Sequence, residues 1–322
     1  MRRTITSLTL LFAVLLAAPI GFARSPVASA ERPRSFAIGL IGDFPYDDLG
    51  VAQAENLIDE INSRRLSFVI HDGDIKAGST PCTDDVYLAN LDRFNRIEDP
   101  LIYTPGDNEW TDCHRTGGDP LERLDFLRGI FFPTDQSLGG RTITLNRQSD
   151  AYPENVRWTR GGVTFATLHI VGSNNNLGRT PEADAEYTAR NAANLEWLHE
   201  SFEAARKKDS PGIMIAIQAN PGFELEPDDP ERTGFNDFLA ALEQETLAFG
   251  RPVVLVHGDS HYFRIDKPMY SSETGAHVVS FTRVETFGPP DVHWVRAVVR
   301  PGSSEVFSFD DEIVEENVTP AP

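Results

Sequence analysis

Four aspartates in this sequence follow a glycine at the point where an apolar run ends. They are Asp43, Asp74, Asp107 and Asp259, and an imidazole, His261, comes two residues after the last of them. Glycine allows the chain to turn sharply and lets the backbone approach a ligand closely. Carboxylate oxygens and imidazole nitrogens are common ligands of divalent cations in proteins. The pattern therefore predicts a metal site built from the ends of four strands.

The elements that position the first three aspartates follow from the hydrophobic pattern. Apolar runs at 35–42, 66–71 and 101–104 are typical of buried strands, and the segments between them carry apolar residues at helical spacing. Strands that alternate with helices favour a parallel sheet with right-handed crossovers. The carboxyl ends of such strands lie at one edge of the sheet, so we expect the three aspartates to meet there.

The second half of the chain continues this α/β pattern. We expect strands at 163–171, 213–217 and 253–256, a long helix at 185–207, and a polar, irregular excursion at 136–160. Three final segments, at 278–282, 294–299 and 306–309, are interpreted as consecutive antiparallel strands. No internal repeat or linker divides the chain, so we expect one domain at 31–310. The acidic segment at 311–322 is predicted to be a flexible tail.

The first 30 residues have the features of a secretory signal peptide. Two arginines open the chain, an apolar stretch follows, and Ala28-Ser29-Ala30 is a small-residue cleavage site. A membrane anchor is the alternative, but the apolar stretch is shorter than the ~20 residues that a span needs. We therefore expect a secreted or periplasmic protein whose mature form has no stable membrane span. The chain has 322 residues and a formal net charge of −20, which disfavours binding to a nucleic acid polymer.

The sequence contains two cysteines, Cys82 and Cys113. An even pair in an exported protein suggests a disulfide, and two free thiols are the alternative. Each cysteine lies a few residues beyond one of the two central Gly-Asp pairs. A bridge would therefore brace the Asp74 loop against the Asp107 loop.

The series of strand ends resembles the calcineurin-like metallophosphoesterases, over roughly residues 35–309. That family has a four-layer α/β/β/α sandwich and a two-metal centre. Its pattern runs D-x-H, GD, GN-H-[DE], a lone His, and GH-x-H. In this sequence the five places read Asp43-Phe44-Pro45, Gly73-Asp74, Gly106-Asp107-Asn108-Glu109, the segment 218–220, and Gly258-Asp259-Ser260-His261.

Several positions depart from the family pattern. Pro45 stands where the first His would be, and Asn108 stands where the family has the His that protonates the leaving oxygen or holds the phosphate. Asp259 replaces the first His of the last pair. The lone His is absent, and either Gln218 or Asn220 stands in for it, or nothing does.

The resemblance implies a ligand assignment for two ions. Asp74 would bridge both ions, Asp43 and His261 would serve one, and Asp107 and Asp259 would serve the other. Such a shell consists mainly of hard oxygen donors, which favours manganese, magnesium or calcium over iron or zinc.

Other residues near the strand ends are candidates for contact with a substrate. Asn108 could donate a hydrogen bond to phosphate, although an amide cannot act as a general acid. His114 is a candidate for the replacement acid. Lys76 and Arg115 could bind a phosphate oxygen, and solvated surface charge is the alternative for both.

These features lead to two hypotheses. The first is a secreted, metal-dependent phosphoesterase that hydrolyses phosphate mono- or diesters of a small phosphorylated substrate with metal-activated water. The second is a catalytically impaired protein of the same fold that binds a metal or an anionic ligand. The sequence leaves the oligomeric state open.

Overall fold

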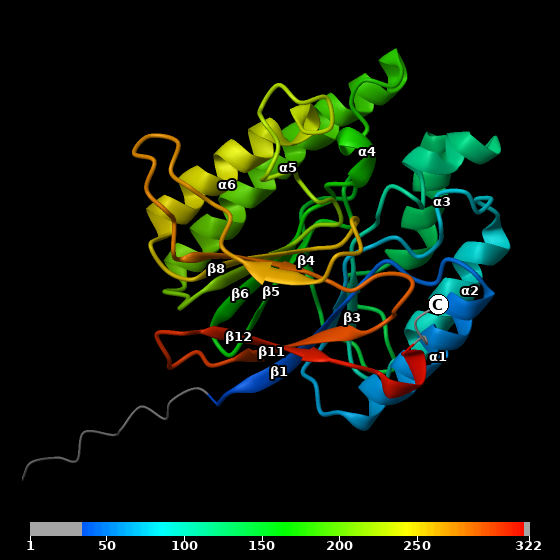
Figure 1. Cartoon of the computed structure of the whole chain (residues 1–322), viewed down its shortest axis with the longest axis horizontal. Helices are drawn as coiled ribbons and strands as arrows, with labels where there is room; N and C mark the ends of the chain where they lie inside the picture. The colour runs from blue at the N-terminus through cyan, green and yellow to red at the C-terminus, as the bar shows by residue number, and fades with distance from the viewer. Residues whose placement is uncertain (1–33, 319–322) are drawn as a thin grey trace, which may run out of the picture. The chain divides into compact units, whose positions relative to one another are not determined.

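Two β-sheets pack face to face in the computed structural model of this chain, and helices cover the outer face of each sheet (Figure 1). The structure describes residues 34–318. The layers run helices, sheet, sheet, helices, which confirms the predicted four-layer α/β/β/α sandwich. The predicted signal peptide at 1–30 lies outside the described residues, as do the last four residues of the chain.

The first sheet has the strand order β12-β11-β1-β2-β3. Its strands are β1 (Phe36–Ile41), β2 (Val69–His71), β3 (Leu101–Tyr103), β11 (Trp294–Val299) and β12 (Phe307–Glu312). Strands β1, β2 and β3 are parallel, as predicted. Strand β11 pairs antiparallel with β1, and β12 pairs antiparallel with β11. Three helices pack on the outer face: α1 (Asp48–Ser63), α2 (Asp84–Arg96) and α3 (Pro120–Phe131).

The second sheet has the strand order β4-β5-β6-β7-β8-β10-β9. Its strands are β4 (Asn146–Arg147), β5 (Val156–Arg160), β6 (Val163–Thr167), β7 (Ile213–Ala216), β8 (Val253–His257), β9 (Arg264–Asp266) and β10 (Phe281–Glu285). Strands β6, β7, β8 and β10 are parallel neighbours. Two long helices cover this sheet, α5 (Pro181–Lys207) and α6 (Asn236–Phe249).

The apolar core lies in three layers because alternate residues of a strand point to opposite faces of its sheet. In β1, Ile38 and Leu40 face the second sheet, while Ala37 and Ile41 face the helices of the first sheet. Burying one such aliphatic side chain is worth about 1.5–3 kcal/mol. The strands are therefore held from both sides, which fixes where their ends lie.

Several helices begin at residues that sequence rules favour as caps. The carboxylate of Asp47 accepts a hydrogen bond from the backbone N–H of Gly50 at the start of α1. Thr180 does the same for Ala183 at the start of α5, where Pro181 occupies the first turn. Such side chains satisfy backbone donors that the helix itself leaves without partners.

Two predictions about strands need correction. The irregular excursion expected at 136–160 contains two strands, β4 and β5. Strand β5 pairs antiparallel with β6 and β4 pairs antiparallel with β5, so both extend the second sheet. The segment expected to open an antiparallel series, 278–282, instead leads into β10, which pairs parallel with β8 in the second sheet. Of the three segments expected to form this series, only β11 and β12 lie in the first sheet, where β11 pairs antiparallel with β1 and with β12. Both errors arise because pairing depends on distant partners rather than on local pattern.

The predicted flexible tail is partly wrong. Strand β12 extends to Glu312, and a short 3-10 helix, η3 (Glu315–Asn317), follows it. The side chain of Asn317 is buried and donates hydrogen bonds to the carbonyls of Gln53 and Val292. The chain is therefore anchored to α1 as far as this residue.

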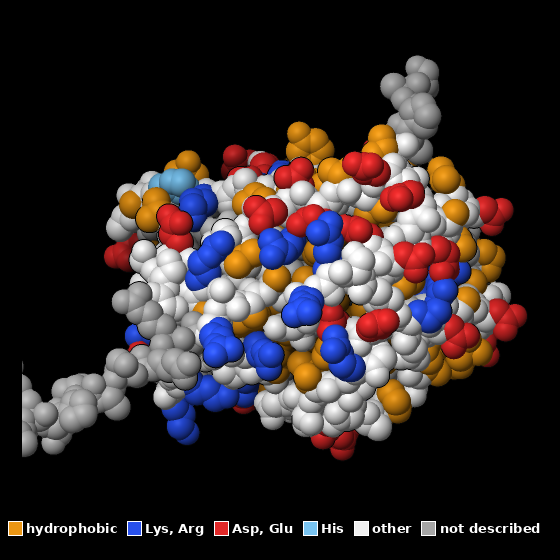
Figure 2. Space-filling view, turned by 90° about the horizontal axis from the view of Figure 1, so that it is seen from below, with side chains coloured by type: hydrophobic (Ala, Val, Ile, Leu, Met, Phe, Trp, Pro, Cys, Tyr) orange, Lys and Arg blue, Asp and Glu red, His pale blue; other side chains and the backbone are white. Residues whose placement is uncertain are grey.

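Positive side chains gather on part of the surface in spite of the net negative charge. Figure 2 shows Lys and Arg side chains clustered in the middle of one face. Four cations, Arg157, Arg160, Lys207 and Lys208, also line a hollow of about 970 Å³. The overall charge therefore does not describe every part of the surface. Within residues 34–318, no helix combines the length and the apolar composition that crossing a membrane requires.

Candidate metal centre

Three of the four predicted aspartates converge at the carboxyl ends of the strands. Asp74 follows β2, Asp107 follows β3 and Asp259 follows β8, so the cluster draws on both sheets. Each offers a carboxylate oxygen, and these three atoms all lie within 4.8 Å of one another. Asp74 and Asp107 are buried and Asp259 is partly buried. The structure therefore brings together three of the aspartates that the sequence predicts to meet.

The local backbone explains why glycines accompany these aspartates. A Cβ added at Gly106 would lie 2.0 Å from Oδ1 of Asp74, and one added at Gly258 would lie 2.2 Å from Oδ2 of Asp43. A side chain at either place would displace a carboxylate. The aspartates themselves turn through the left-handed region, with φ of 58° at Asp74 and 79° at Asp259. These turns aim the carboxylates across the strand ends.

The cluster holds more negative charge than its surroundings accommodate. Burial, followed by the charge of Asp107, raises the pKa of Asp74 well above its usual range and that of Asp259 to about 7. A bound divalent cation would relieve this repulsion, and oxygen donors of this kind are those that hard cations prefer. The residues present therefore fit a divalent metal ion.

Asp43 and His261 lie beside this cluster and share a partner that sequence analysis missed. The hydroxyl of Tyr46 lies 3.0 Å from Oδ2 of Asp74, 3.1 Å from Nε2 of His261 and 3.5 Å from Oδ1 of Asp43. Nε2 of His261 lies 3.7 Å from Oδ1 of Asp43. The available signal was the spacing in Gly42-Asp43-Phe44-Pro45-Tyr46, which puts a hydroxyl three residues beyond a carboxylate at a turn.

A cleft of about 670 Å³ opens beside the acidic cluster. Asp259 and Ser173 line this cleft, together with the exposed ring of Tyr262 and with Arg264. The guanidinium of Arg264 is paired with Glu224 and Glu285. The cleft therefore reaches the acidic cluster at Asp259.

Solved structures with the same architecture identify the fold. The chain superposes on a dimetal phosphatase from Danio rerio with a TM-score of 0.53, at 13% identity, over 88% of this chain and 97% of that one. It superposes on PhoD with a TM-score of 0.51 at 11% identity, and on the purple acid phosphatase PPD1 from yellow lupin with 0.51 at 12% identity. The chain has the calcineurin-like metallophosphoesterase fold. It covers 64% of PhoD and 54% of the lupin enzyme, with 83% and 88% of its own length. The sequence matches no protein-family model and no curated protein.

Within this metallophosphoesterase fold, neither amide expected at the lone-His position turns its oxygen toward the acidic cluster, although a side-chain hydrogen bond from Gln218 acts to lower the pKa of Asp259. Oε1 of Gln218 accepts a hydrogen bond of 2.6 Å from the backbone N–H of Gly172. The side-chain amide of Asn220 contacts Ser260 and Gly222, and only its backbone N–H reaches the carboxylate of Asp259. Gln218 therefore supports the loop at Gly172, and the structure does not turn the side chain of Asn220 toward the acidic cluster.

Asn108 lies at the centre of the site. Its Nδ2 is 2.8 Å from Oδ2 of Asp74 and 3.2 Å from the hydroxyl of Tyr46. The amide oxygen of Asn108 and the guanidinium of Arg115 both lie beside Gly78, where an added Cβ would meet them at 2.6 and 3.0 Å. Arg115 is half exposed and is paired with Asp112 at 2.6 Å.

The structure places Lys76 and His114, two other side chains predicted to contact a substrate, in different surroundings. Lys76 is 1% exposed, and burial lowers the pKa of its ammonium group although the charges of Glu109 and Asp74 oppose this; the group donates to the carbonyl of Ala77. It is a buried cation beneath the site rather than a solvated surface charge. The imidazole of His114 is exposed and contacts the carbonyl of Thr111 on its own turn. The structure therefore does not bring His114 to the acidic cluster.

A left-handed turn after β6 supplies a second residue that sequence analysis missed. Residues 173–176 have φ values of 52°, 51°, 56° and 67°. The turn places the hydroxyl of Ser173 2.6 Å from Oδ2 of Asp107 and 3.1 Å from Oδ1 of Asp112. Burial and the charge of Asp107 raise the pKa of Asp112 to about 6. Ser173 thus links the acidic cluster to the carboxylate that holds Arg115.

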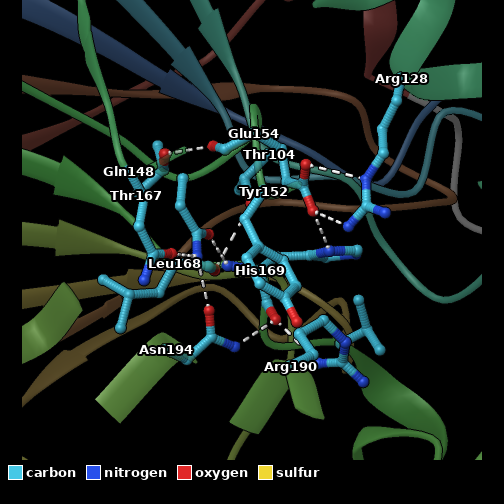
Figure 3. A network of polar contacts seen from close by, with 12 residues as sticks. Thr104, Arg128, Gln148, Tyr152, Glu154, Thr167, Leu168, His169, Arg190 and Asn194 are labelled. Atoms are coloured by element: carbon cyan, nitrogen blue, oxygen red, sulfur yellow. Dashed lines mark hydrogen bonds and ion pairs between the residues drawn. The ribbon is translucent and has the colours of Figure 1, made fainter. Parts of the chain in front are cut away.

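The buried side chain of Arg190 holds this turn in place. It donates hydrogen bonds to Oδ1 and the carbonyl of Asn175 and to the carbonyl of His169. Figure 3 shows Arg190 and Asn194 reaching the His169 segment from α5, while the carboxylate of Glu154 lies between His169 and Arg128. Burial alone would raise the pKa of Glu154, but the charges of these two partners lower it to about 2. The network ties helices of both outer layers to the segment that bears Ser173.

The two cysteines form a disulfide, with Cα atoms 5.7 Å apart and a sequence separation of 31. Cys82 precedes α2, and Cys113 lies in the 3-10 helix η1 (Thr111–Thr116) that follows Asp107. The bridge therefore braces the two central loops against each other, as expected from the sequence.

Proposed function

We propose that this chain is a metal-dependent phosphoesterase that hydrolyses phosphate mono- or diesters of small molecules. The observation that carries the proposal is the convergence of Asp74, Asp107 and Asp259 within 4.8 Å at the end of an open cleft. Solved structures of the same fold that are named as phosphatases support it.

We propose two divalent ions, with Asp107 and Asp259 as donors to one, Asp43 and His261 as donors to the other, and Asp74 shared. Four of these five donors are carboxylates. Hard oxygen donors favour manganese, magnesium or calcium over iron or zinc. Such ions, when bound, polarise a phosphoryl oxygen and lower the pKa of a water molecule.

The surrounding side chains would bind and orient the substrate. Nδ2 of Asn108, which donates to Asp74, and the half-exposed guanidinium of Arg115 would donate hydrogen bonds to phosphate oxygens. The buried ammonium of Lys76 adds a fixed positive charge beneath them.

Protonation of the leaving group is the weak step in this site. Asn108 cannot supply a proton, and His114 faces its own turn. Esters whose leaving group is already stable as an anion depend least on a general acid. We therefore propose that the enzyme prefers such substrates, for example aryl phosphodiesters.

We also propose that the protein is exported, since the predicted signal peptide and the disulfide point to an oxidising compartment.

The test is hydrolysis of an aryl phosphodiester and an aryl phosphomonoester by the mature chain, with and without added Mn²⁺. Asp74→Ala should lose turnover, whereas Asp228→Ala, at an exposed aspartate, should keep it. Equal background turnover in the wild type and Asp74→Ala would remove the proposal.

The placement of His114 and Asn108 favours one alternative, a protein that binds metal and phosphate without turnover. Calorimetric titration with Mn²⁺ and inorganic phosphate distinguishes the two. Binding of both ligands without hydrolysis of either ester would support the alternative.

A further inference from the structure

The hydroxyl of Tyr46 lies among two carboxylates, an imidazole and the amide of Asn108, which donates to it. It contacts carboxylate oxygens of Asp74 and Asp43 at 3.0 and 3.5 Å, and Nε2 of His261 at 3.1 Å. A phenol supplies one proton. Two other buried tyrosines show the ordinary case, because Tyr87 donates to the carbonyl of Glu109 and Tyr103 donates to its carboxylate.

The spacing of these atoms is that of ligands around a common ion. Two donors that each lie about 2.1 Å from an ion are roughly 3.0–3.4 Å apart in octahedral or tetrahedral coordination. The hydroxyl lies 3.0–3.5 Å from its three neighbours. The nitrogen of His261 and the oxygen of Asp43 are 3.7 Å apart. A cation among them would contact the phenol oxygen, both carboxylates and the imidazole together, whereas the single phenol proton can serve only one of these partners.

We propose that the oxygen of Tyr46 is a ligand of the ion held by Asp43 and His261. The loop after β1 has Pro45 in place of a second ligand, and the next residue brings an oxygen to the same group of atoms. The donor set is then two carboxylates, one phenol oxygen and one imidazole. The proposal rests on the metal-dependent function but concerns binding alone, so it can fail while hydrolysis persists.

The experiment measures how many Mn²⁺ ions the mature, disulfide-bonded chain binds, by equilibrium dialysis with metal analysis and by calorimetric titration. No substrate is present. The wild type should bind two ions. Tyr46→Phe keeps the ring but removes the oxygen, and it should lose one ion or bind it at least tenfold more weakly. His261→Ala should affect the same ion, and the double variant should still bind the other ion as the wild type does.

Tyr262→Phe is the matched control because this ring is exposed and adjacent to His261 in sequence. It should bind Mn²⁺ as the wild type does. Melting curves in chelator establish that each variant is folded. Unchanged stoichiometry and affinity in Tyr46→Phe would overturn the proposal. A wild type that binds one ion, with Tyr46→Phe binding two, would also overturn it, because the hydroxyl would then fill the place of an ion.

Discussion

Replacing Asp259 by asparagine should stabilise the metal-free protein at neutral and alkaline pH, although it removes a proposed ligand. The pKa of Asp259 is raised from 3.8 to about 7 by burial and by the charge of Asp107. In the unfolded chain this carboxyl ionises near pH 4, so between pH 4 and pH 7 the unfolded state releases a proton that the folded state retains. Stability is therefore lost as pH rises through this window.

The magnitude follows from the shift of about 3 pKa units. At ~1.4 kcal/mol per unit, ionised Asp259 costs the folded state up to roughly 4 kcal/mol at pH 8. Asparagine avoids this cost and can still accept the hydrogen bond from the N–H of Asn220. With an unfolding entropy of about 2.1 cal/mol/K per residue, residues 34–318 give roughly 0.6 kcal/mol/K. Asp259→Asn should then melt up to about 7 °C higher at pH 8 and at nearly the same temperature at pH 4.

The assay is thermal unfolding in chelator at several values between pH 4 and pH 8. Burial lowers the pKa of His71 and His257 to about 3, so both proteins lose stability together below about pH 6. The difference between the two proteins is thus the informative quantity. Asp228→Asn, at an exposed position, should show no such difference. An Asp259→Asn protein that is less stable at pH 8, or a difference independent of pH, would refute the reasoning.

Three further outcomes are expected. Manganese, magnesium or calcium should raise the melting temperature of the wild type and a chelator should lower it; an iron or zinc pair that survives dialysis against chelator would contradict the proposed donors. Arg190→Met should lower the free energy of unfolding by about 3–5 kcal/mol, because it removes the ion-pair partner of the partly buried Glu186 and the buried donors to Asn175 and His169; an unchanged denaturant midpoint would count against this network. Mass spectrometry without reductant should find the Cys82–Cys113 peptides linked, and replacing both by serine should cost roughly 3–4 kcal/mol.

The sequence was sufficient to place the four aspartates because each depends on a local signal. An apolar run that stops at Gly-Asp ends a strand, and parallel strands share the edge where they end. Asp259 comes from the second sheet, yet it meets Asp74 and Asp107 because the carboxyl ends of β8 and β2 face the same end of the sandwich. The resemblance to a family supplied the two-sheet arrangement, which the local pattern alone does not contain.

Features that depend on distant contacts were beyond the reach of sequence reasoning. The run at 281–285 has the composition of the other strands, and only its pairing with β8 places it in the second sheet. Tyr46 is an unremarkable residue in a loop until the turn at Asp43, with φ of 59°, brings its hydroxyl back toward Asp74. The amide of Gln218 could have faced a metal, but the backbone of Gly172 takes its oxygen.

The left-handed turn at 173–176 was the hardest of these features to predict from the sequence. The free energy that this conformation costs is informative about its role. Four successive residues in this conformation cost up to about 4–8 kcal/mol, although asparagine tolerates it better than most. The buried guanidinium of Arg190 and the contacts of Asn174 with Thr233 and Gly234 offset that cost. Strained backbone persists where surrounding structure imposes it, and such places cluster at functional sites. Here the strain holds a hydroxyl 2.6 Å from Asp107, a contact that a right-handed turn at Ser173 would redirect.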